Sequence, residues 1–170
     1  MDKTILLLVR HGETIDNVNQ ILQGQTHGEL TETGRQQAQQ LADRLADDNI
    51  DIFMSSDLKR AEDTCRIIAL PHHRQVLTTP LLRERDWGGF TGMFIPDLKD
   101  RVWPEDIETI GEMKERARRF LMMLRQRYQG KKVLAVGHGI INKAIQSVYY
   151  GKPMNEIPKM ANADVVVIEV

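Results

Sequence analysis

Short apolar runs alternate with helical patterns along this chain, and this alternation limits its fold more than any other feature. Residues 4–10 contain an unbroken apolar stretch, and residues 133–136 and 165–168 form two more. Strands of this kind are buried on both faces, as in a parallel sheet that helices cover. The alternation therefore predicts an α/β fold with a mostly parallel central sheet and helices on both of its faces.

The other elements follow from apolar residues at helical spacing or in short extended segments. The strongest such pattern predicts an amphipathic helix over residues 110–128. Thr31 is the expected N-cap of another helix, and a third is expected to begin at Asp57, with Asp57 or Ser56 as its cap. The remaining expectations are extended segments at residues 51–54 and 76–82 and a helix that begins near Ile140. Without repeats or long linkers, residues 1–170 are expected to form one domain.

Composition argues against several classes of protein. A net charge of -1 over 170 residues leaves no basic surface for nucleic acid or an anionic membrane. We see no apolar stretch as long as a transmembrane helix and no signal-peptide pattern at the start of the chain. The lone cysteine, Cys65, cannot form an internal disulfide, which suits a reducing compartment. We expect a cytoplasmic protein, and its oligomeric state stays open.

Two histidines follow apolar runs at equivalent places in the pattern. His11 ends the first run and precedes Gly12, whereas His138 follows residues 133–136 and lies between two glycines. The carboxyl ends of parallel strands meet at one edge of a sheet, where open α/β proteins bind their ligands. The two imidazoles are therefore expected to share one pocket, and the glycines would let backbone and ligand approach closely.

The ligand expected in this pocket is an anion. Two histidines would also suit zinc, but Arg10 lies directly beside His11, and a neighbouring cation disfavours a bound dication. An arginine, two imidazoles and a helix N-terminus together favour phosphate. No metal is therefore expected at this site.

Two more charged residues are candidates for the same edge, and each has a simpler interpretation. Arg60 falls in the first turn of the helix predicted from Asp57, where spacing alone favours a solvated surface arginine. Glu84 lies in a loop between Arg83 and Arg85. A carboxylic acid beside a phosphate can donate a proton, because the nearby anion favours its protonated form. An exposed ion pair with either arginine is the simpler alternative.

Six segments, in their order along the chain, resemble the histidine phosphatase superfamily, in the branch that includes cofactor-dependent phosphoglycerate mutase. They are LVRHGET with Asn17, LQG at residues 22–24, LTETG, SSDLKRAEDT, LRERDWGGFTG and VLAVGHG. The resemblance covers nearly the whole chain, and the six motifs together are specific. It implies a three-layer α/β/α sandwich, and the chemistry requires no metal or organic cofactor.

The resemblance also implies a role for each candidate residue. His11 is the expected nucleophile, and its attacking nitrogen must be unprotonated, which requires an acceptor for the other ring nitrogen. Glu84 is the expected proton donor. The residues expected to bind the phosphoryl group are Arg10, Arg60 and His138, and those expected to complete its pocket are Asn17, Gln23 and Gly24.

The expected activity is hydrolysis of a small phosphorylated metabolite through a phosphohistidine, and α-ribazole phosphate is one candidate substrate. Residues 90–106 are few for a closing lid, which favours hydrolysis over transfer to a second alcohol. Phosphoglycerate mutase activity is the main alternative, and a phosphate-binding protein without turnover is the third. The aromatic residues within 87–94 either line an apolar flank of the pocket or belong to the core. The role of His27 stays open.

Overall fold

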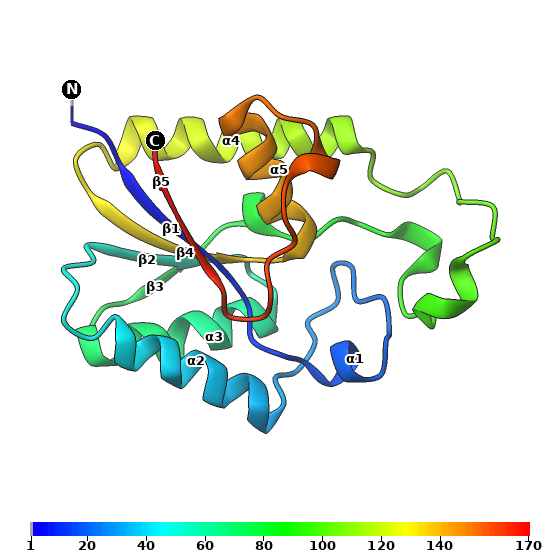
Figure 1. Cartoon of the computed structure of the whole chain (residues 1–170), viewed down its shortest axis with the longest axis horizontal. Coiled ribbons are helices and arrows are strands. Elements are labelled where there is room, and N and C mark those ends of the chain that lie inside the picture. Colours follow the sequence, from blue (N-terminus) through cyan, green and yellow to red (C-terminus); the bar gives the residue numbers. More distant parts are fainter. Residues whose placement is uncertain (1) are drawn as a thin grey trace.

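The computed structural model describes residues 2–170 and contains a five-stranded sheet with helices on both faces (Figure 1). The strands are β1 (Ile5–Arg10), β2 (Ile52–Ser55), β3 (Val76–Thr78), β4 (Lys132–Gly137) and β5 (Val165–Glu169). Their spatial order is β3-β2-β4-β1-β5. The first four run parallel to their neighbours, and β5 alone pairs antiparallel, with β1. The predicted α/β class with a mostly parallel sheet is confirmed.

Two helical layers enclose the sheet. The helices are α1 (Ile15–Val18), α2 (Glu32–Arg44), α3 (Lys59–Ala69), α4 (Ile110–Arg127) and α5 (Gly139–Tyr150). Along β1 the side chains alternate, so Leu6 and Leu8 join the core under α4 and α5. Leu7 and Val9 join the core under α2 and α3. The continuous apolar run of β1 is thus explained by burial on both faces, as in a three-layer sandwich.

The predicted N-cap is confirmed for one helix and wrong for another. Thr31 caps α2, and its hydroxyl accepts a hydrogen bond from the Gly34 N–H at 2.9 Å. The helix predicted from Asp57 begins later, with Leu58 at the N-cap and no side-chain bond there. The expected cap is absent because the Asp57 carboxylate pairs with Arg83 instead. Arg60 nevertheless falls in the first turn of α3.

The segment at residues 76–82 is extended only in its first part. Strand β3 ends at Thr78, and a 3-10 turn follows at Pro80–Leu82. Pro80 lacks the N–H that a strand would use, and its fixed φ suits the first turn of a helix. The Thr79 hydroxyl caps this turn by accepting from the Leu81 N–H at 3.2 Å.

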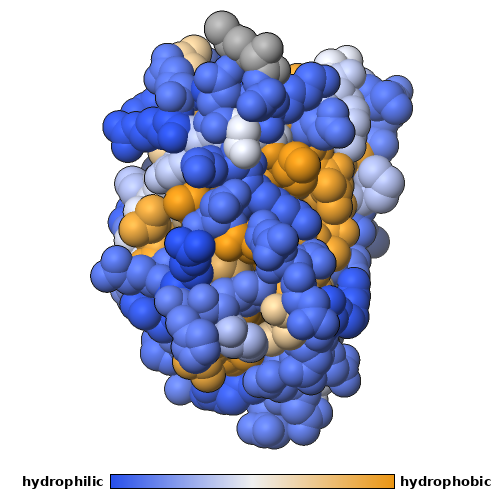
Figure 2. All heavy atoms as spheres, turned by 90° about the vertical axis from the view of Figure 1, so that its left-hand side faces the viewer, coloured by the Kyte–Doolittle hydropathy of each residue, from blue (hydrophilic) through white to orange (hydrophobic). Residues whose placement is uncertain are grey.

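The carboxyl ends of β1 and β4 meet at one edge of the sheet. Arg10 is the register partner of Gly137, so His11 and His138 leave neighbouring strands at the same level. The end of the molecule opposite this edge shows mostly hydrophilic residues with apolar patches between them (Figure 2). Within residues 2–170, no helix has both the length and the apolar character needed to cross a membrane.

Candidate active site

The two histidines form a buried pair at the edge of the sheet. Their ring centroids lie 5.1 Å apart, and neither ring is open to bulk solvent. The Nδ1 atom of His11 lies 2.7 Å from the Gly12 carbonyl oxygen, so Nδ1 carries the proton and donates it. The Nε2 atom of His11 is therefore left with a free lone pair. Burial, then the charges of Arg60 and Arg10, lowers the pKa of His11 to about 3, so the neutral ring prevails near neutral pH.

The second histidine is held by a serine from the neighbouring strand end. The Nε2 atom of His138 lies 2.7 Å from the Ser56 hydroxyl, whereas its Nδ1 atom has no hydrogen-bond partner among residues 2–170. Burial, followed by the charge of Arg60, places the pKa of His138 well below 6.5. His138 is therefore neutral in the free protein and donates through one ring nitrogen only.

Arg60 lies inside the protein, and its interpretation as a solvated surface residue is wrong. Its side chain is 1% exposed, and its guanidinium donates to carbonyl oxygens of the loop after α1. These acceptors are Gly24 at 2.8 Å, His27 at 3.3 Å and Thr26. Burial lowers the pKa of Arg60 to about 10, although Glu84 opposes the shift, so the residue stays charged near neutral pH.

Arg10 is held by the segment that precedes β5. Its guanidinium donates to the Met160 carbonyl at 2.9 Å. Neither the Nε of Arg10 nor that of Arg60 has a hydrogen-bond partner within the described residues. Two partly unsatisfied guanidinium groups near a neutral imidazole leave charged donors that can bind an anion.

Glu84 does not form the surface ion pair that its neighbours suggested. Arg83 pairs with Asp57 at 2.6 Å, and the Arg85 guanidinium lies over the Trp87 ring, 4.6 Å from its centroid. The Glu84 carboxylate instead accepts backbone N–H bonds from Ile140, Ile141 and Arg85, between 2.9 and 3.2 Å. The carboxylate therefore lies at the N-terminus of α5, of which His138 is the N-cap, and the helix dipole favours an acidic group there.

A cavity of about 140 Å³ joins these residues. Its polar lining consists of Arg10, His11, Asn17, Gln23, Gly24, Arg60 and Glu84, and its apolar lining of Ile21, Leu22, Trp87, Ile95 and Ile140. His138 is not part of this lining and lies beside the His11 ring instead. The structure thus brings the candidate residues to one place, with seven of the eight at the cavity wall.

The open questions about neighbouring residues have structural answers. Trp87 lines the cavity, whereas Phe90 is 5% exposed and belongs to the core, so the loop serves both purposes. His27 contributes through its carbonyl, which holds Arg60, and its Nδ1 accepts from the Lys59 N–H. Asn17 completes the capping box of α1, because its side chain accepts from the N–H of the N-cap residue Thr14 at 3.0 Å. Across residues 2–170, no three His, Cys, Asp or Glu side chains are grouped to hold a metal ion.

Sequence reasoning missed the segment that precedes β5. The Met160 carbonyl holds Arg10, and the Asn162 side chain donates to the His11 carbonyl at 3.1 Å. Nothing in the local pattern of this segment indicates contact with a site formed by the first strand. The sequence indicates Ser56 only as a candidate helix cap, whereas in the structure its hydroxyl is the partner of His138.

Residues 6–170 match the family model of the histidine phosphatase superfamily (branch 1). The chain belongs to this superfamily. The resemblance of the six motifs is thereby confirmed, and membership makes the chain an enzyme of the histidine phosphatase type.

Individual relatives are similar over most of their length. The chain is 34% identical over 165 residues to the uncharacterized phosphatase PhoE of Bacillus subtilis, covering 94% of this chain and 85% of that protein. The structure resembles a mycobacterial glucosyl-3-phosphoglycerate phosphatase complexed with VO3, with a TM-score of 0.87 and 26% identity over 96% of this chain and 91% of that one. It also resembles a putative α-ribazole-5′-P phosphatase from Escherichia coli, with a TM-score of 0.86 and 25% identity over 98% and 90% of the two chains.

Proposed function

We propose that this protein hydrolyses phosphate monoesters of small metabolites through a phosphohistidine on His11, without a metal ion. The observation that carries the proposal is the hydrogen bond from His11 Nδ1 to the Gly12 carbonyl. It keeps the lone pair of Nε2 available, and the low pKa of the ring keeps it available near neutral pH. The charges of half-buried Arg10 and buried Arg60 in the same cavity attract the phosphoryl group.

The first step forms a bond between His11 Nε2 and phosphorus while the bond from phosphorus to the substrate oxygen breaks. Arg10 and Arg60 hold the equatorial oxygens and stabilise their charge, which is the main requirement of phosphoryl transfer. Glu84 gives its proton to the leaving alcohol. The dianionic substrate beside Glu84 favours the protonated carboxylic acid before this step.

In the second step a water molecule attacks phosphorus and the bond to His11 breaks. Glu84, now ionised, accepts a proton from this water, so the carboxylic acid is restored as inorganic phosphate forms. The neutral His11 ring is restored at the same time. His138 contributes as a neutral donor beside the His11 ring, and Asn17, Gln23 and Gly24 complete the pocket wall.

The apolar lining of the cavity supports an alcohol portion with an apolar or aromatic face. Trp87 and Ile95 contribute such surface beside the phosphate subsite. The similarity to a putative α-ribazole-5′-P phosphatase agrees with a ring-containing substrate, so α-ribazole phosphate is our candidate among small phosphorylated metabolites.

The decisive experiment measures inorganic phosphate released from p-nitrophenyl phosphate and a panel of phosphorylated metabolites. Acid-labile label on the wild-type protein, absent from the His11→Ala variant, is the expected result. Residual turnover by a pure His11→Ala preparation would remove His11 as nucleophile.

The same preparation separates the proposal from its alternatives. Efficient interconversion of 2- and 3-phosphoglycerate, primed by a bisphosphate, would identify a phosphoglycerate mutase instead. Phosphate binding without any turnover would identify a non-catalytic binding protein. We expect phosphate release with negligible interconversion, because residues 90–106 are few for a lid that would exclude water from the phosphohistidine.

A further inference from the structure

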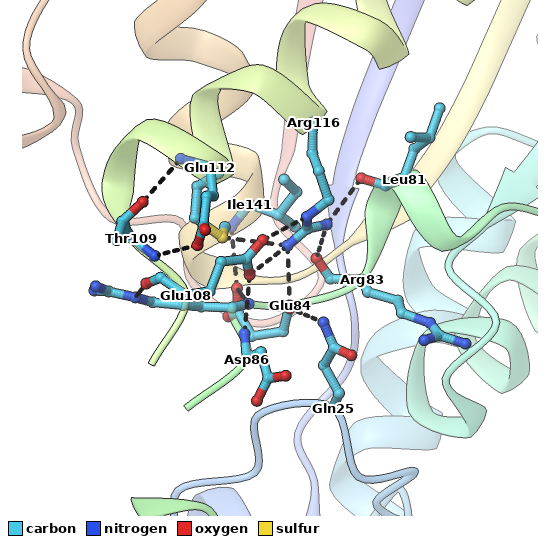
Figure 3. Close-up of polar contacts among 12 residues, drawn as sticks. Gln25, Leu81, Arg83, Glu84, Asp86, Glu108, Thr109, Glu112, Arg116 and Ile141 are labelled. Atoms are coloured by element: carbon cyan, nitrogen blue, oxygen red, sulfur yellow. Dashed lines mark hydrogen bonds and ion pairs between the residues drawn. The ribbon is translucent and has the colours of Figure 1, made fainter. Parts of the chain in front are cut away.

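Arg116, on α4, lies beside the segment that carries Glu84 and outside the lining of the cavity that contains His11. Each of its guanidinium nitrogens donates hydrogen bonds (Figure 3). Nε and Nη2 donate to the two carboxylate oxygens of Glu108 at 2.7 and 2.9 Å. Nη1 donates to the carbonyls of Leu81 and Arg83 at 3.1 and 2.8 Å, and Nη2 donates to that of Glu84 at 3.3 Å. One side chain therefore holds three carbonyls of the segment that carries Glu84.

This segment has little regular structure of its own. Beyond the 3-10 turn at Pro80–Leu82, residues 83–87 belong to no helix or strand. Backbone groups in such a segment need other partners. Glu108 supplies partners for the backbone of Asp86, which follows Glu84 in the segment. Its carboxylate accepts from the Asp86 N–H at 3.0 Å, and its own N–H donates to the Asp86 carbonyl at 2.9 Å. The pair of Arg116 and Glu108 thus fixes the backbone on both sides of Glu84.

The Glu84 residue is consequently held at two ends. Its carboxylate is bonded to the N-terminus of α5, and its carbonyl is bonded to Arg116 and, at 3.2 Å, to the Gln25 side chain. Helices α4 and α5 pack against each other. The guanidinium and the N-terminus of α5 therefore form one rigid frame around the proton donor.

We propose that Arg116 is a positioning residue, which aims Glu84 at the leaving oxygen of the substrate. This inference rests on the proposed role of Glu84 as proton donor. Arg116 itself is not part of the lining of the cavity that contains His11.

A lysine is a poor replacement at this position. The side chains of Arg116 and Glu108 are 17% and 12% exposed, so the ion pair is largely removed from water. Lysine keeps the charge beside Glu108 but lacks the planar fork that reaches three carbonyls and a carboxylate together. Arg116→Lys therefore preserves the ion pair in part while it releases the backbone of Glu84.

The test compares kcat/KM for benzyl phosphate, whose alcohol needs a proton to leave, with that for p-nitrophenyl phosphate, whose phenolate leaves without one. We define the leaving-group ratio as the value for p-nitrophenyl phosphate divided by that for benzyl phosphate. Arg116→Lys is expected to raise this ratio about 10- to 100-fold, part of the 10²–10⁴ that general acid catalysis typically contributes. A merely structural defect would lower both values alike.

Combining the variant with Glu84→Gln tests whether the two residues act together. In the Glu84→Gln background the ratio is already raised, and Arg116→Lys should change it by less than about threefold, because residues that act as one unit are not additive. A full additional increase would contradict the proposal, as would equal slowing of both esters by Arg116→Lys alone.

Two further variants serve as a control and as a second test of the proposal. Arg118→Lys changes an exposed arginine of the same helix that pairs with Glu115, and it should leave the ratio unchanged. Gln25→Leu removes the other donor to the Glu84 carbonyl and should raise the ratio by a smaller factor, which keeps the test open if Arg116→Lys unfolds. An unchanged ratio for Gln25→Leu and any folded Arg116 variant would overturn the proposal.

The Glu84→Gln variant separates a failure of the proton-donor role of Glu84 from a failure of the positioning role of Arg116. If it slows both esters equally, Glu84 is not the proton donor, and the role of Arg116 falls with it. If Glu84→Gln raises the ratio and Arg116→Lys does not, only the positioning role is refuted.

Discussion

The neutral state of buried His11 makes the stability of the fold depend on pH. In the unfolded chain its pKa is near 6.5, whereas burial and the charge of Arg60 lower it to about 3 in the folded protein. Above pH 6.5 neither state is protonated at this residue. As the pH falls from 6.5 toward 3, only the unfolded chain binds the proton, so the free energy of unfolding decreases.

The size of this decrease in the free energy of unfolding follows from the difference between the pH and the pKa of His11 in the unfolded chain. At pH 5 the difference is 6.5 − 5, or about 1.5 units, and at 1.36 kcal/mol per unit His11 destabilises the fold by about 2 kcal/mol. His138, whose pKa is also lowered, adds a loss of the same sign. The His11→Gln variant removes only the first contribution. Relative to the wild type, it should therefore gain about 2 kcal/mol between about pH 7.5 and pH 5.

Urea unfolding followed by the fluorescence of Trp87 and Trp103 measures this quantity at each pH. His73→Asn is a matched control, because His73 is exposed and asparagine tolerates its left-handed φ of 54°. The control should show no comparable gain. If the stability difference between His11→Gln and the wild type stays constant from pH 7.5 to pH 5, His11 titrates alike in both states. The account of a permanently neutral nucleophile would then be refuted.

Three further predictions concern the metal, a close backbone approach and the partner of His138. Incubation with EDTA should leave the rate of p-nitrophenyl phosphate hydrolysis unchanged, because Arg10 and Arg60 supply the charge; a loss that a divalent ion restores would contradict this. Gly34→Ala would place its Cβ 2.1 Å from the Glu13 carbonyl oxygen. Unfolding assays should therefore show destabilisation by about 1–3 kcal/mol, with reduced kcat. Gly111→Ala, whose Cβ would have no contact closer than 3.8 Å, should not destabilise the fold in this way. Ser56→Ala leaves His138 Nε2 unpaired, so urea unfolding should show a loss of about 1–3 kcal/mol, and an unchanged midpoint would argue against the hydrogen bond.

The parts of the fold that depend on local pattern could be predicted from the sequence. The unbroken apolar run within residues 4–10 indicates burial on both faces, so the sheet and its helical layers follow from it. His11 and His138 come directly after their strands, so parallel pairing of β1 with β4 is enough to bring them together. Thr31 could be recognised as a cap because its acceptor role needs only the three residues that follow it.

The parts that depend on distant partners could not be predicted in this way. Asp57 caps no helix because Arg83, far along the chain, binds its carboxylate. In the sequence, Arg116 is one of several charged residues of the segment that forms α4. Only the structure shows that it binds three carbonyls of the Glu84 segment. Such contacts join residues from different elements, and no periodicity of either element encodes them.

The position of β1 in the sheet has a consequence for how the chain is made. It is the first strand to be synthesised, yet its two neighbours are β4 and β5, which are the last. During translation this apolar segment has no native strand to pair with until residues 132–169 have left the ribosome. Its sheet contacts close long loops, which is costly in entropy and slows folding. The nascent chain therefore carries this apolar segment without either strand partner for most of its synthesis, and unpaired strands of this kind favour aggregation.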